Sequence, residues 1–434
     1  MPHSHSDADI EEEQRHFSNV ITTFSNYASY SLAANNRRRK DIFTLPKGDQ
    51  DLLSSLGYKD RLDAVDKAIL KNAEFLNQIV ADPEIFGHDV SDDEGDVEGD
   101  EEENKETGGG QIDGQHSHSH NHDHAHDHDH DHGHGHSHSH EHGHDHDHSH
   151  GSPRKSKKYR PNEGDLDKVR STLKQFVRDW SEEGKEEREI AYGPMKEALL
   201  AHYHDIPERE RRNFRVLVPG AGLGRLAYDV ASLGFACQAN EFSHYMLLAS
   251  YLVLNKTSQP KSHTIYPYVH TFSNAPSRSS LLRAISIPDV VPSLPRGSNF
   301  SLVAGDFEEI YGGGQELAPV GPHEEPQNGL WDAVLTCFFI DTAKNIVNYL
   351  RILHRILAPG GVWINMGPLL WHWENNNTGD PSIELDLEEV KELARKIGFD
   401  ISNEKTIDAT YVTNSEGMLG YTYRATFWTA TKRV

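Results

Sequence analysis

Residues 216–242 read VLVPGAGLGRLAYDVASLGFACQANEF, and this stretch decides the fold. An apolar run ends in a glycine-rich turn at Gly220, Gly222 and Gly224, and a helix with periodic apolar residues follows. Glycines permit a tight turn and let a ligand approach the backbone closely. Glu241 ends the next predicted strand, where an acid binds ribose hydroxyls. The stretch therefore predicts the first half of a nucleotide-binding α/β sheet.

Predicted strands and helices alternate from residue 214 to the end of the chain. Short apolar runs predict the strands, and apolar residues every three or four positions predict the helices. The predicted strands are 215–218, 236–241, 300–305, 331–339, 361–366, 399–407 and 421–430, and the predicted helices are 224–233, 243–254, 342–357 and 386–397. This alternation indicates a doubly wound, seven-stranded, Rossmann-like α/β sheet.

Two cofactors, NAD and S-adenosylmethionine, fit the glycine turn equally well, and later segments separate them. SLVAGDFEEIY (301–311) ends a third strand in Asp306, positioned to contact an adenine edge, with Phe307 beside the ring. WDAVLTCFFIDT (331–342) and the helix–PGG–strand segment ILHRILAPGGVWINMG (352–367) have the form typical of class I methyltransferases. The whole series favours S-adenosylmethionine.

Several longer strings resemble the carnosine N-methyltransferase family. They are KQFVRDWSEEGKEER (174–188), VPGAGLGRLAYDVASLGF (218–235), ANEFSHYMLLASYLVLN (239–255), GSNFSLVAGDFEEIY (297–311), CFFIDTAKNI (337–346) and INMGPLLWHWEN (364–375). The resemblance runs from about residue 10 to 430, apart from an insert at 90–160. It implies methyl transfer from S-adenosylmethionine to the imidazole of carnosine (β-alanyl-histidine), giving anserine, or to a related histidine dipeptide.

The resemblance also implies which residues form the site. The cofactor contacts fall on Gln175, Arg178, Gly220, Gly222, Glu241, Asp306, Phe307 and Cys337. The predicted catalytic, substrate-contacting residues are Asp341, His372, Tyr423 and Tyr421. Lys344 stands where the family pattern leads us to expect histidine; because it lies one turn into the predicted helix, the change puts little in doubt. No metal site is predicted in the catalytic machinery.

The chemistry agrees with these roles. Free imidazole has a pKa near 6.5 and is mostly neutral at pH 7, so a sulfonium methyl needs no strong general base. Alignment of the reactants can lower the barrier by about 7–11 kcal/mol. Asp341 can accept the ring N–H, His372 can orient the ring or receive its proton, and Tyr423 can set its tilt.

Each of these residues also has a structural interpretation. Asp341 precedes a predicted helix and would make a good N-cap. His372 lies between two tryptophans, where a packed core histidine is common, and Tyr421 and Tyr423 share one face of a predicted strand. Two other functions also stay open: methylation of histidine in a protein or peptide, and a non-catalytic, metal-buffering or interaction protein with a vestigial fold.

The chain divides into three predicted regions. Apolar periodicity predicts amphipathic helices over 10–33 and 58–80, so 1–90 is expected to be a helical extension that packs on the catalytic domain. Residues 91–161 are expected to be a disordered acidic and histidine-rich insert with a basic end. Residues 162–434 are expected to form the methyltransferase domain.

The insert carries 18 of the 30 histidines, at every even position from 116 to 150. Imidazole binds zinc and nickel well, so the tract is either a metal reservoir or a linker that binds divalent metal adventitiously, and we favour the linker. The basic end, PRKSKKYRP (153–161), is either a nuclear-import signal or a solvated charge run, and the second is the default.

Charge and cysteine content indicate which partners and which cell compartment to expect. Of the net charge of −25, residues 91–150 contribute −17, so the remaining chain is only mildly acidic and binding to nucleic acid is not expected. Cys237 and Cys337 are too few for a disulfide framework, which favours a reducing compartment, the cytoplasm or the nucleus. We expect the protein in the cytoplasm and also consider the nucleus. No apolar stretch is long enough to span a membrane. The family resemblance favours a homodimer.

Overall fold

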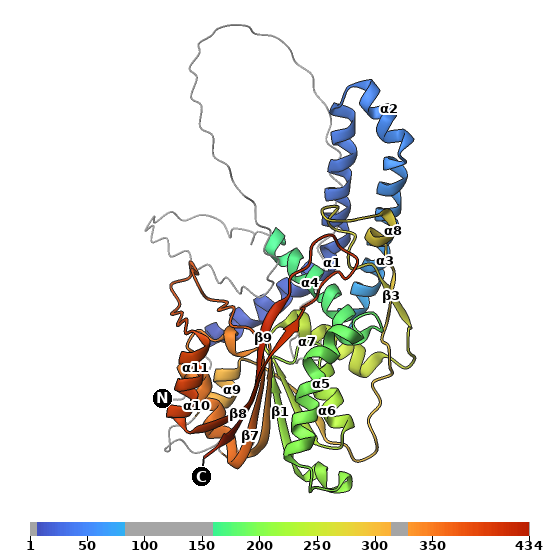
Figure 1. Ribbon diagram of the computed structural model, residues 1–434. Helices are drawn as coiled ribbons and strands as arrows, with labels where there is room; N and C mark the ends of the chain where they lie inside the picture. The colour runs from blue at the N-terminus through green and yellow to red at the C-terminus, as the bar shows by residue number, and fades with distance from the viewer. Residues whose placement is uncertain (1–6, 83–158, 314–328, 434) are drawn as a thin grey trace, which may run out of the picture.

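A computed structural model describes residues 7–82, 159–313 and 329–433, so the histidine tract and the basic run over 153–158 lie outside the described residues. The main sheet has seven strands in the order β5-β2-β1-β6-β7-β9-β8, with β9 antiparallel to both neighbours (Figure 1). The strands are β1 (Arg215–Pro219), β2 (Ala236–Glu241), β5 (Phe300–Ala304), β6 (Trp331–Cys337), β7 (Leu357–Gly367), β8 (Phe399–Ala409) and β9 (Tyr423–Lys432). The predicted seven-stranded sheet is confirmed.

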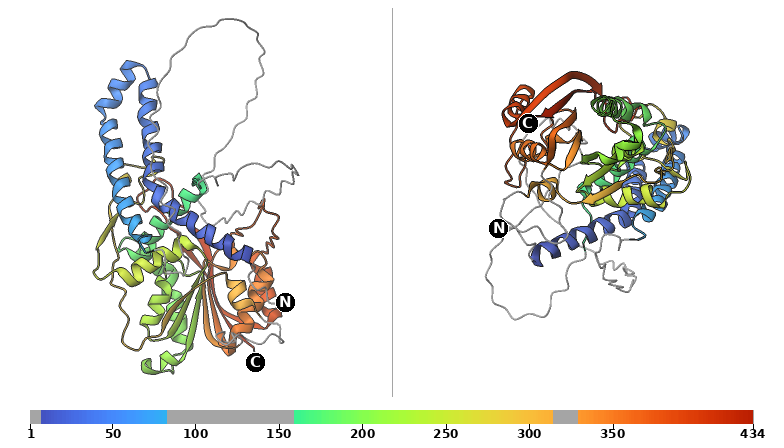
Figure 2. Two further views of the ribbon diagram at one scale, coloured as in Figure 1. Left: turned by 180° about the vertical axis from the view of Figure 1, so that it is seen from behind. Right: turned by 90° about the horizontal axis from the view of Figure 1, so that it is seen from below.

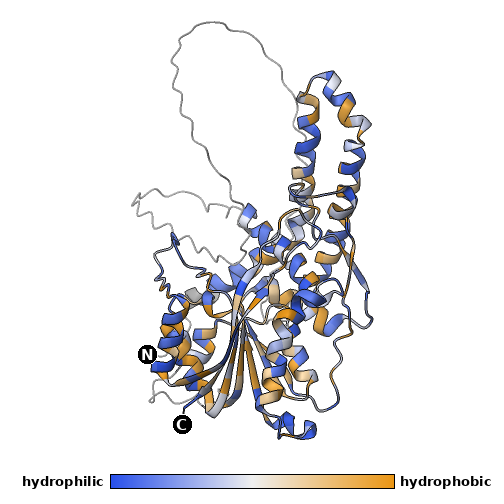
Figure 3. Cartoon of the chain, in the orientation of Figure 1, coloured by the Kyte–Doolittle hydropathy of each residue, from blue (hydrophilic) through white to orange (hydrophobic). Residues whose placement is uncertain are grey.

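Both faces of this sheet are covered by helices, because its strands place apolar side chains on both faces. In β1, Val216 and Val218 belong to one buried apolar cluster, and Leu217 belongs to another. The first cluster includes α5 (Lys185–His202) and α6 (Arg225–Ser232). The second includes α9 (Phe307–Gly312), α10 (Ile346–Ile356) and α11 (Leu387–Ile397). Figure 3 shows the apolar residues gathered along the strands between these two layers, so the sheet is doubly wound as predicted.

Two predicted helices differ from the observed ones at their ends. The helix predicted over 342–357 begins at Ile346, where the Asn345 side chain accepts the Val347 N–H at 3.1 Å and caps it. Residues 340–342 form a separate 3₁₀ turn, so the N-cap interpretation of Asp341 is wrong. The helix predicted over 243–254 is α7 (His244–Tyr251), followed by a π turn at Leu252–Lys256.

Three helices precede the catalytic part. They are α1 (Asp7–Thr44), α2 (Lys47–Ser55) and α3 (Tyr58–Ile79). The first part of α1 lies along the catalytic part, and the end of α1, α2 and the start of α3 extend away from it as an arm (Figures 1 and 2). α1 and α3 share a buried apolar cluster with α4 (Glu163–Trp180) and α7, in which Phe17, Phe75, Phe176 and Tyr245 take part. None of the helices in the described ranges is long and apolar enough to cross a membrane.

A connection between α7 and β5 holds a short hairpin and a buried ion network. The hairpin pairs β3 (His263–Ile265) with β4 (Ile285–Ile287), and α8 (Arg278–Leu281) lies between them. Asp289, just after β4, accepts hydrogen bonds from Arg188 of α5 and, at 2.7 Å, from Arg225 of α6. Arg188 also donates to the carbonyl of Ser181 at 2.6 Å. The network therefore joins the end of α4 to α5 and α6, and Arg188 also donates to the carbonyl of Arg178, one of the predicted cofactor contacts.

Replacing Asp289 by alanine is expected to lower the free energy of unfolding by about 3 kcal/mol, because two buried guanidinium groups lose their shared carboxylate. Urea unfolding followed by circular dichroism measures this loss. Glu74→Ala is the control, since it removes an exposed ion pair with Lys71 and should change stability far less. Equal losses in the two variants would show that the network does not hold these helices together.

Candidate active site

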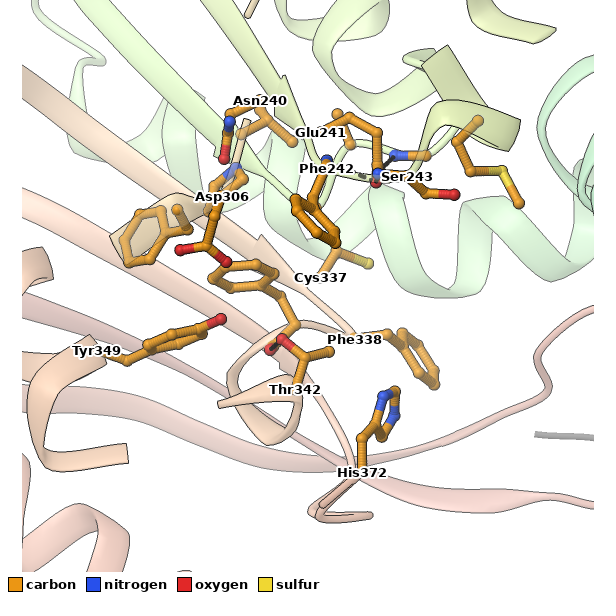
Figure 4. Close-up of a pocket in the computed structure, with 18 of the residues that line it drawn as sticks. Asn240, Glu241, Phe242, Ser243, Asp306, Cys337, Phe338, Thr342, Tyr349 and His372 are labelled. Carbon is orange, nitrogen blue, oxygen red and sulfur yellow. Dashed lines mark hydrogen bonds between the residues drawn. The ribbon is translucent and has the colours of Figure 1, made fainter. Parts of the chain in front are cut away.

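One cavity of about 610 Å³ lies at the carboxyl ends of β1, β2, β5 and β6 (Figure 4). Ligands of doubly wound sheets bind at this edge, and this volume is typical of small-molecule sites. Its wall includes all eight residues predicted to contact the cofactor, together with His372: Gln175, Arg178, Gly220, Gly222, Glu241, Asp306, Phe307 and Cys337. The other three predicted catalytic residues are not part of the wall.

The glycine turn lies closely against the cavity wall. Gly220 has φ +62°, and a Cβ atom there would lie 2.5 Å from a ring carbon of Phe339. The Gly222 N–H donates to Glu241 Oε2 at 2.7 Å, and the N–H groups of Phe242 and Ser243 donate to Oε1 at 2.9 and 2.8 Å (Figure 4). Burial raises the pKa of Glu241, although these hydrogen bonds oppose the shift. The carboxylate is thereby held in one orientation at the end of β2.

Asp306 and Phe307 begin the short helix α9. Asp306 Oδ1 accepts the N–H groups of Glu308 and Glu309 at 2.7 and 3.2 Å, which fixes the carboxylate. The Phe307 ring is buried and packs against Phe339 and Tyr349, at centroid distances of 5.3 and 5.1 Å. Figure 4 shows Asp306 and Tyr349 together on one side of the cavity. This side of the cavity, lined by aromatic rings, suits a ligand that carries a planar ring.

The upstream helix α4 contributes a buried polar cluster at the other end of the cavity. Gln175 donates to Asp179 Oδ2 at 2.9 Å, and Arg178 donates to Asp179 Oδ1 at 3.1 Å and to the Tyr192 hydroxyl at 2.6 Å. Burial opposes the charge of Arg178, but Tyr192 and Asp179 together hold the pKa of its guanidinium above the ordinary range. A fixed cation therefore lies on the cavity wall.

Cys337 ends β6 on the wall between these two sides. Burial raises the pKa of its thiol to about 11, partly opposed by the nearby Arg178. The thiol is therefore neutral at pH 7 and acts as an apolar part of the wall.

Asp341 and His372 come from the segments that follow β6 and β7. The His372 N–H donates to the Asp341 carbonyl at 3.0 Å, and Asp341 Oδ2 accepts the Leu370 N–H at 2.9 Å. Asp341 is only 2% exposed, and its Oδ1 has no hydrogen-bond partner among the described residues. Burial raises the pKa of Asp341 to about 6. A buried carboxylate with one unpartnered oxygen among the described residues therefore lies on a segment whose backbone is hydrogen-bonded to His372. The His372 ring lies beside Phe338 at the cavity (Figure 4).

The two predicted tyrosines differ in their surroundings. Tyr423 begins β9 and packs against the Phe338 ring at a centroid distance of 6.0 Å. Burial raises its pKa, and the nearby Asp341 and Tyr421 add to the shift. Tyr421 lies before the strand and is half exposed. Because β9 begins only at Tyr423, the prediction that the two tyrosines share one strand face is wrong. Neither tyrosine lines the cavity.

Some residues of the site were not predicted from the sequence. Asp179 does not line the cavity itself but pairs with the wall residues Gln175 and Arg178. It carries a signal, because it lies four residues after Gln175 on the same side of a helix. Phe338 and Tyr411 carry none: Phe338 has φ +52° just after β6, and Tyr411 lies in the connection between β8 and β9. Their rings lie 5.0 Å apart on the cavity wall. Only the fold brings them together.

Lys344 has a different place from the one predicted. It precedes α10 instead of lying inside it, and it lines the cavity. Its ammonium donates to Asp380 Oδ1 at 2.8 Å and lies 4.2 Å from the Trp373 ring centroid. The lysine that replaces the expected histidine is therefore part of the cavity wall, and it contacts the segment that follows His372.

Replacing Lys344 by methionine is expected to lower kcat/KM about 3- to 10-fold, because one ion pair and one cation–π contact, each worth about 0.5–1 kcal/mol, are lost. Steady-state kinetics at low salt and at 0.5 M NaCl test this. The difference from the unchanged protein should shrink at high salt, because salt screens the exposed ion pair. Lys396→Met, at an exposed pair with Glu392, is the control. A salt-independent loss would contradict the ion-pair explanation.

The comparison with known protein families agrees with this geometry. Residues 155–434 match the family model described as carnosine N-methyltransferase, and this range contains every wall residue of the cavity. The chain belongs to the carnosine N-methyltransferase family.

The carnosine N-methyltransferase from Mus musculus is 45% identical over 273 residues, which cover 62% of this chain and 64% of the mouse protein. The Schizosaccharomyces pombe enzyme of the same name is 43% identical over 61% of this chain and 70% of its own length. The carnosine N-methyltransferase unmet from Drosophila melanogaster is 38% identical over 61% of this chain and 55% of that protein. The match thus spans a little under two thirds of the mouse relative.

Proposed function

We propose that this family member is an S-adenosylmethionine-dependent N-methyltransferase that methylates the imidazole ring of carnosine to anserine, or the ring of a related histidine dipeptide. One observation carries the proposal: a single small-molecule-sized cavity is lined by the glycine turn, the Glu241 and Asp306 carboxylates and the ring of His372. Family membership and relatives named as carnosine N-methyltransferases support the choice of acceptor.

The wall residues fit S-adenosylmethionine. Glu241 at the end of β2 suits ribose hydroxyls, and Asp306 with Phe307 suits an adenine ring. Gln175 and Arg178 suit the amino-acid end of the molecule, since a buried guanidinium pairs well with a carboxylate. The absence of a Cβ atom at Gly220 lets the Phe339 ring pack closely against the glycine turn. When bound, the cofactor supplies an electrophilic methyl group on a sulfonium centre.

The chain's own residues then orient the acceptor ring. Asp341 does not line the cavity, but its chain neighbour Thr342 does. On acceptor binding its Oδ1, unpartnered among the described residues, would accept the N–H of one imidazole nitrogen and leave the lone pair of the other nitrogen facing the cavity. The same oxygen receives that proton after methylation, and its pKa of about 6 is close to that of imidazole. His372 faces the ring from the cavity wall, and the Tyr423 ring packs against Phe338.

The test uses purified full-length protein, methyl-labelled S-adenosylmethionine and carnosine, with β-alanyl-alanine as an acceptor that has no imidazole. We expect label on the carnosine ring and none on the control dipeptide, with anserine distinguished from its ring isomer by NMR. Absence of label on carnosine, together with labelled histidine in proteins of a cell extract, would replace this function by protein histidine methylation.

We further propose a homodimer located in the cytoplasm, with the nucleus as the alternative. Three large apolar side chains near the tip of the helical arm support self-association: Phe43, Leu52 and Leu56 are 67%, 65% and 78% exposed. Light scattering is expected to give twice the monomer mass for the unchanged protein. It is expected to give the monomer mass for the variant in which all three residues are replaced by serine.

The proposed location rests on the two cysteines. The free thiols of Cys237 and Cys337 support a reducing compartment, and microscopy of the fluorescently tagged protein tests this location.

A further inference from the structure

The connection between β8 and β9 contains a strained turn at 410–413. Val412 has φ +48°, a left-handed backbone conformation that β-branched residues rarely adopt. Such conformations persist only where surrounding contacts enforce them, and they cluster at functional sites. The neighbouring Tyr411 lines the cavity, so the turn is part of the site. A group that enforces the turn also sets the position of the Tyr411 ring.

Glu187, near the start of α5, supplies that enforcement. Its Oε1 accepts the Val412 N–H at 2.6 Å, and its Oε2 accepts the Thr413 N–H at 3.1 Å and the Thr410 hydroxyl at 3.2 Å. Its side chain is only 12% exposed. One carboxylate from a distant helix therefore satisfies three donors of the turn, and hydrogen bonds to an ionised acceptor are strong.

The same carboxylate also contacts the cofactor side of the cavity. Glu187 Oε1 lies 3.5 Å from Arg178 Nε. The Arg178 guanidinium lies 4.7 Å from the Tyr411 ring centroid, and Tyr411 packs at 5.0 Å against Phe338, beside His372 in Figure 4. A continuous set of contacts thus runs from Glu187 and Arg178 through Tyr411 to the side of the cavity where His372 lies.

We propose that Glu187 is a positioning residue: it holds the strained 410–413 turn so that Tyr411 packs between Arg178 and Phe338 and shapes the acceptor side of the cavity. The inference rests on the proposed methyl transfer to a histidine dipeptide. Glu187 acts through Tyr411 and does not itself line the cavity.

Kinetics of Glu187→Gln at saturating S-adenosylmethionine test the proposal. The amide retains one acceptor oxygen and turns its NH₂ toward a backbone donor, so we expect KM for carnosine to rise about 10-fold while kcat changes less than about 2-fold. Glu186→Gln, on the exposed neighbour, is the matched control and should leave KM unchanged. An unchanged KM in Glu187→Gln overturns the proposal.

A second substitution separates positioning from general damage. Glycine adopts φ +48° without strain, so Val412→Gly added to Glu187→Gln is expected to return KM to within about 3-fold of the unchanged protein. A merely structural role for Glu187 predicts that the second substitution deepens the loss, and that result overturns the proposal.

Hydrogen exchange provides a readout that does not depend on the acceptor. In Glu187→Gln, the amides of Val412 and Thr413 are expected to exchange at least about 10-fold faster, while β1 and β6 keep their rates. Unchanged exchange in the turn contradicts the positioning role. If the turn loosens but carnosine is not methylated by the unchanged protein, the proposed function fails and the positioning of the turn stands.

Discussion

Replacing Asp341 by asparagine is expected to lower kcat/KM for carnosine about 100-fold. The substitution keeps the shape of the side chain but removes the charge, and a hydrogen bond to a charged group is worth about 1.5–3 kcal/mol. The asparagine NH₂ would also stand where Oδ1 now has no partner among the described residues and would oppose the ring N–H. Steady-state kinetics measure the loss. Asp400→Asn, whose side chain is 70% exposed, is the control.

Although Asp341→Asn is expected to lower activity, it is expected to make the folded protein more stable, relative to the unchanged protein, as the pH rises. Burial raises the pKa of Asp341 to about 6, so between about pH 4 and 6 the folded protein binds more protons at this site than the unfolded chain. The carboxyl therefore lowers stability as the pH rises through this range, and above pH 6 the penalty is constant.

Comparing the two proteins isolates this group. From pH 5 to pH 7.5 the stability of Asp341→Asn relative to the unchanged protein should increase by about 1 kcal/mol, measured by urea unfolding at both pH values. A pH-independent difference would show that the carboxylate is already stabilised by a partner. A loss of activity without this stability change would therefore argue against the buried, unpartnered acceptor.

Replacing Gly220 by alanine is expected to raise the dissociation constant for S-adenosylmethionine at least about 30-fold. The left-handed conformation costs about 1–2 kcal/mol for a residue with a Cβ. The new Cβ would in addition lie 2.5 Å from the Phe339 ring, which is stacked on Tyr349 at 5.2 Å and packed against Phe307. Relief of the clash must therefore displace other rings of the cavity wall. Isothermal titration calorimetry measures the change.

Gly360→Ala is the matched control for this experiment. Gly360 has φ +75°, and a Cβ atom there would meet nothing within 4 Å. Both variants carry backbone strain, but only Gly220→Ala changes the cavity wall. We expect Gly360→Ala to lose some stability and to keep its affinity for S-adenosylmethionine. Equal loss of affinity in the two variants would show that strain, and not the wall, is responsible.

The parts of the site that were predictable lie where strands end. Glu241, Asp306 and Cys337 end or directly follow parallel strands, and the carboxyl ends of such strands meet at one edge. Their placement in one cavity therefore follows from the strand pattern. Gln175 and Arg178 came only from the family resemblance, because the sequence of α4 does not indicate which of its polar side chains reach the cavity.

The rest of the site depends on chain turns that leave no periodic signal. Asn345 takes the capping role that Asp341 could have filled, and this frees Asp341 to be buried without a partner at Oδ1 among the described residues. Lys344 joins the wall because α10 begins two residues after it. Tyr411 reaches the wall because Glu187, more than 200 residues earlier, holds its turn. These positions depend on which groups cap the helices and turns, and the sequence pattern alone does not show which group does so.

The sequence by itself determined the seven-stranded doubly wound sheet, the glycine turn and the edge at which a ligand binds, because periodicity and strand-end chemistry are local properties. Only the tertiary structure decided that Asp341 is a buried acceptor, that Lys344 lines the cavity and that Tyr421 lies half exposed. Burial and pairing depend on which segments meet in space, and the pKa of a carboxyl depends on that meeting.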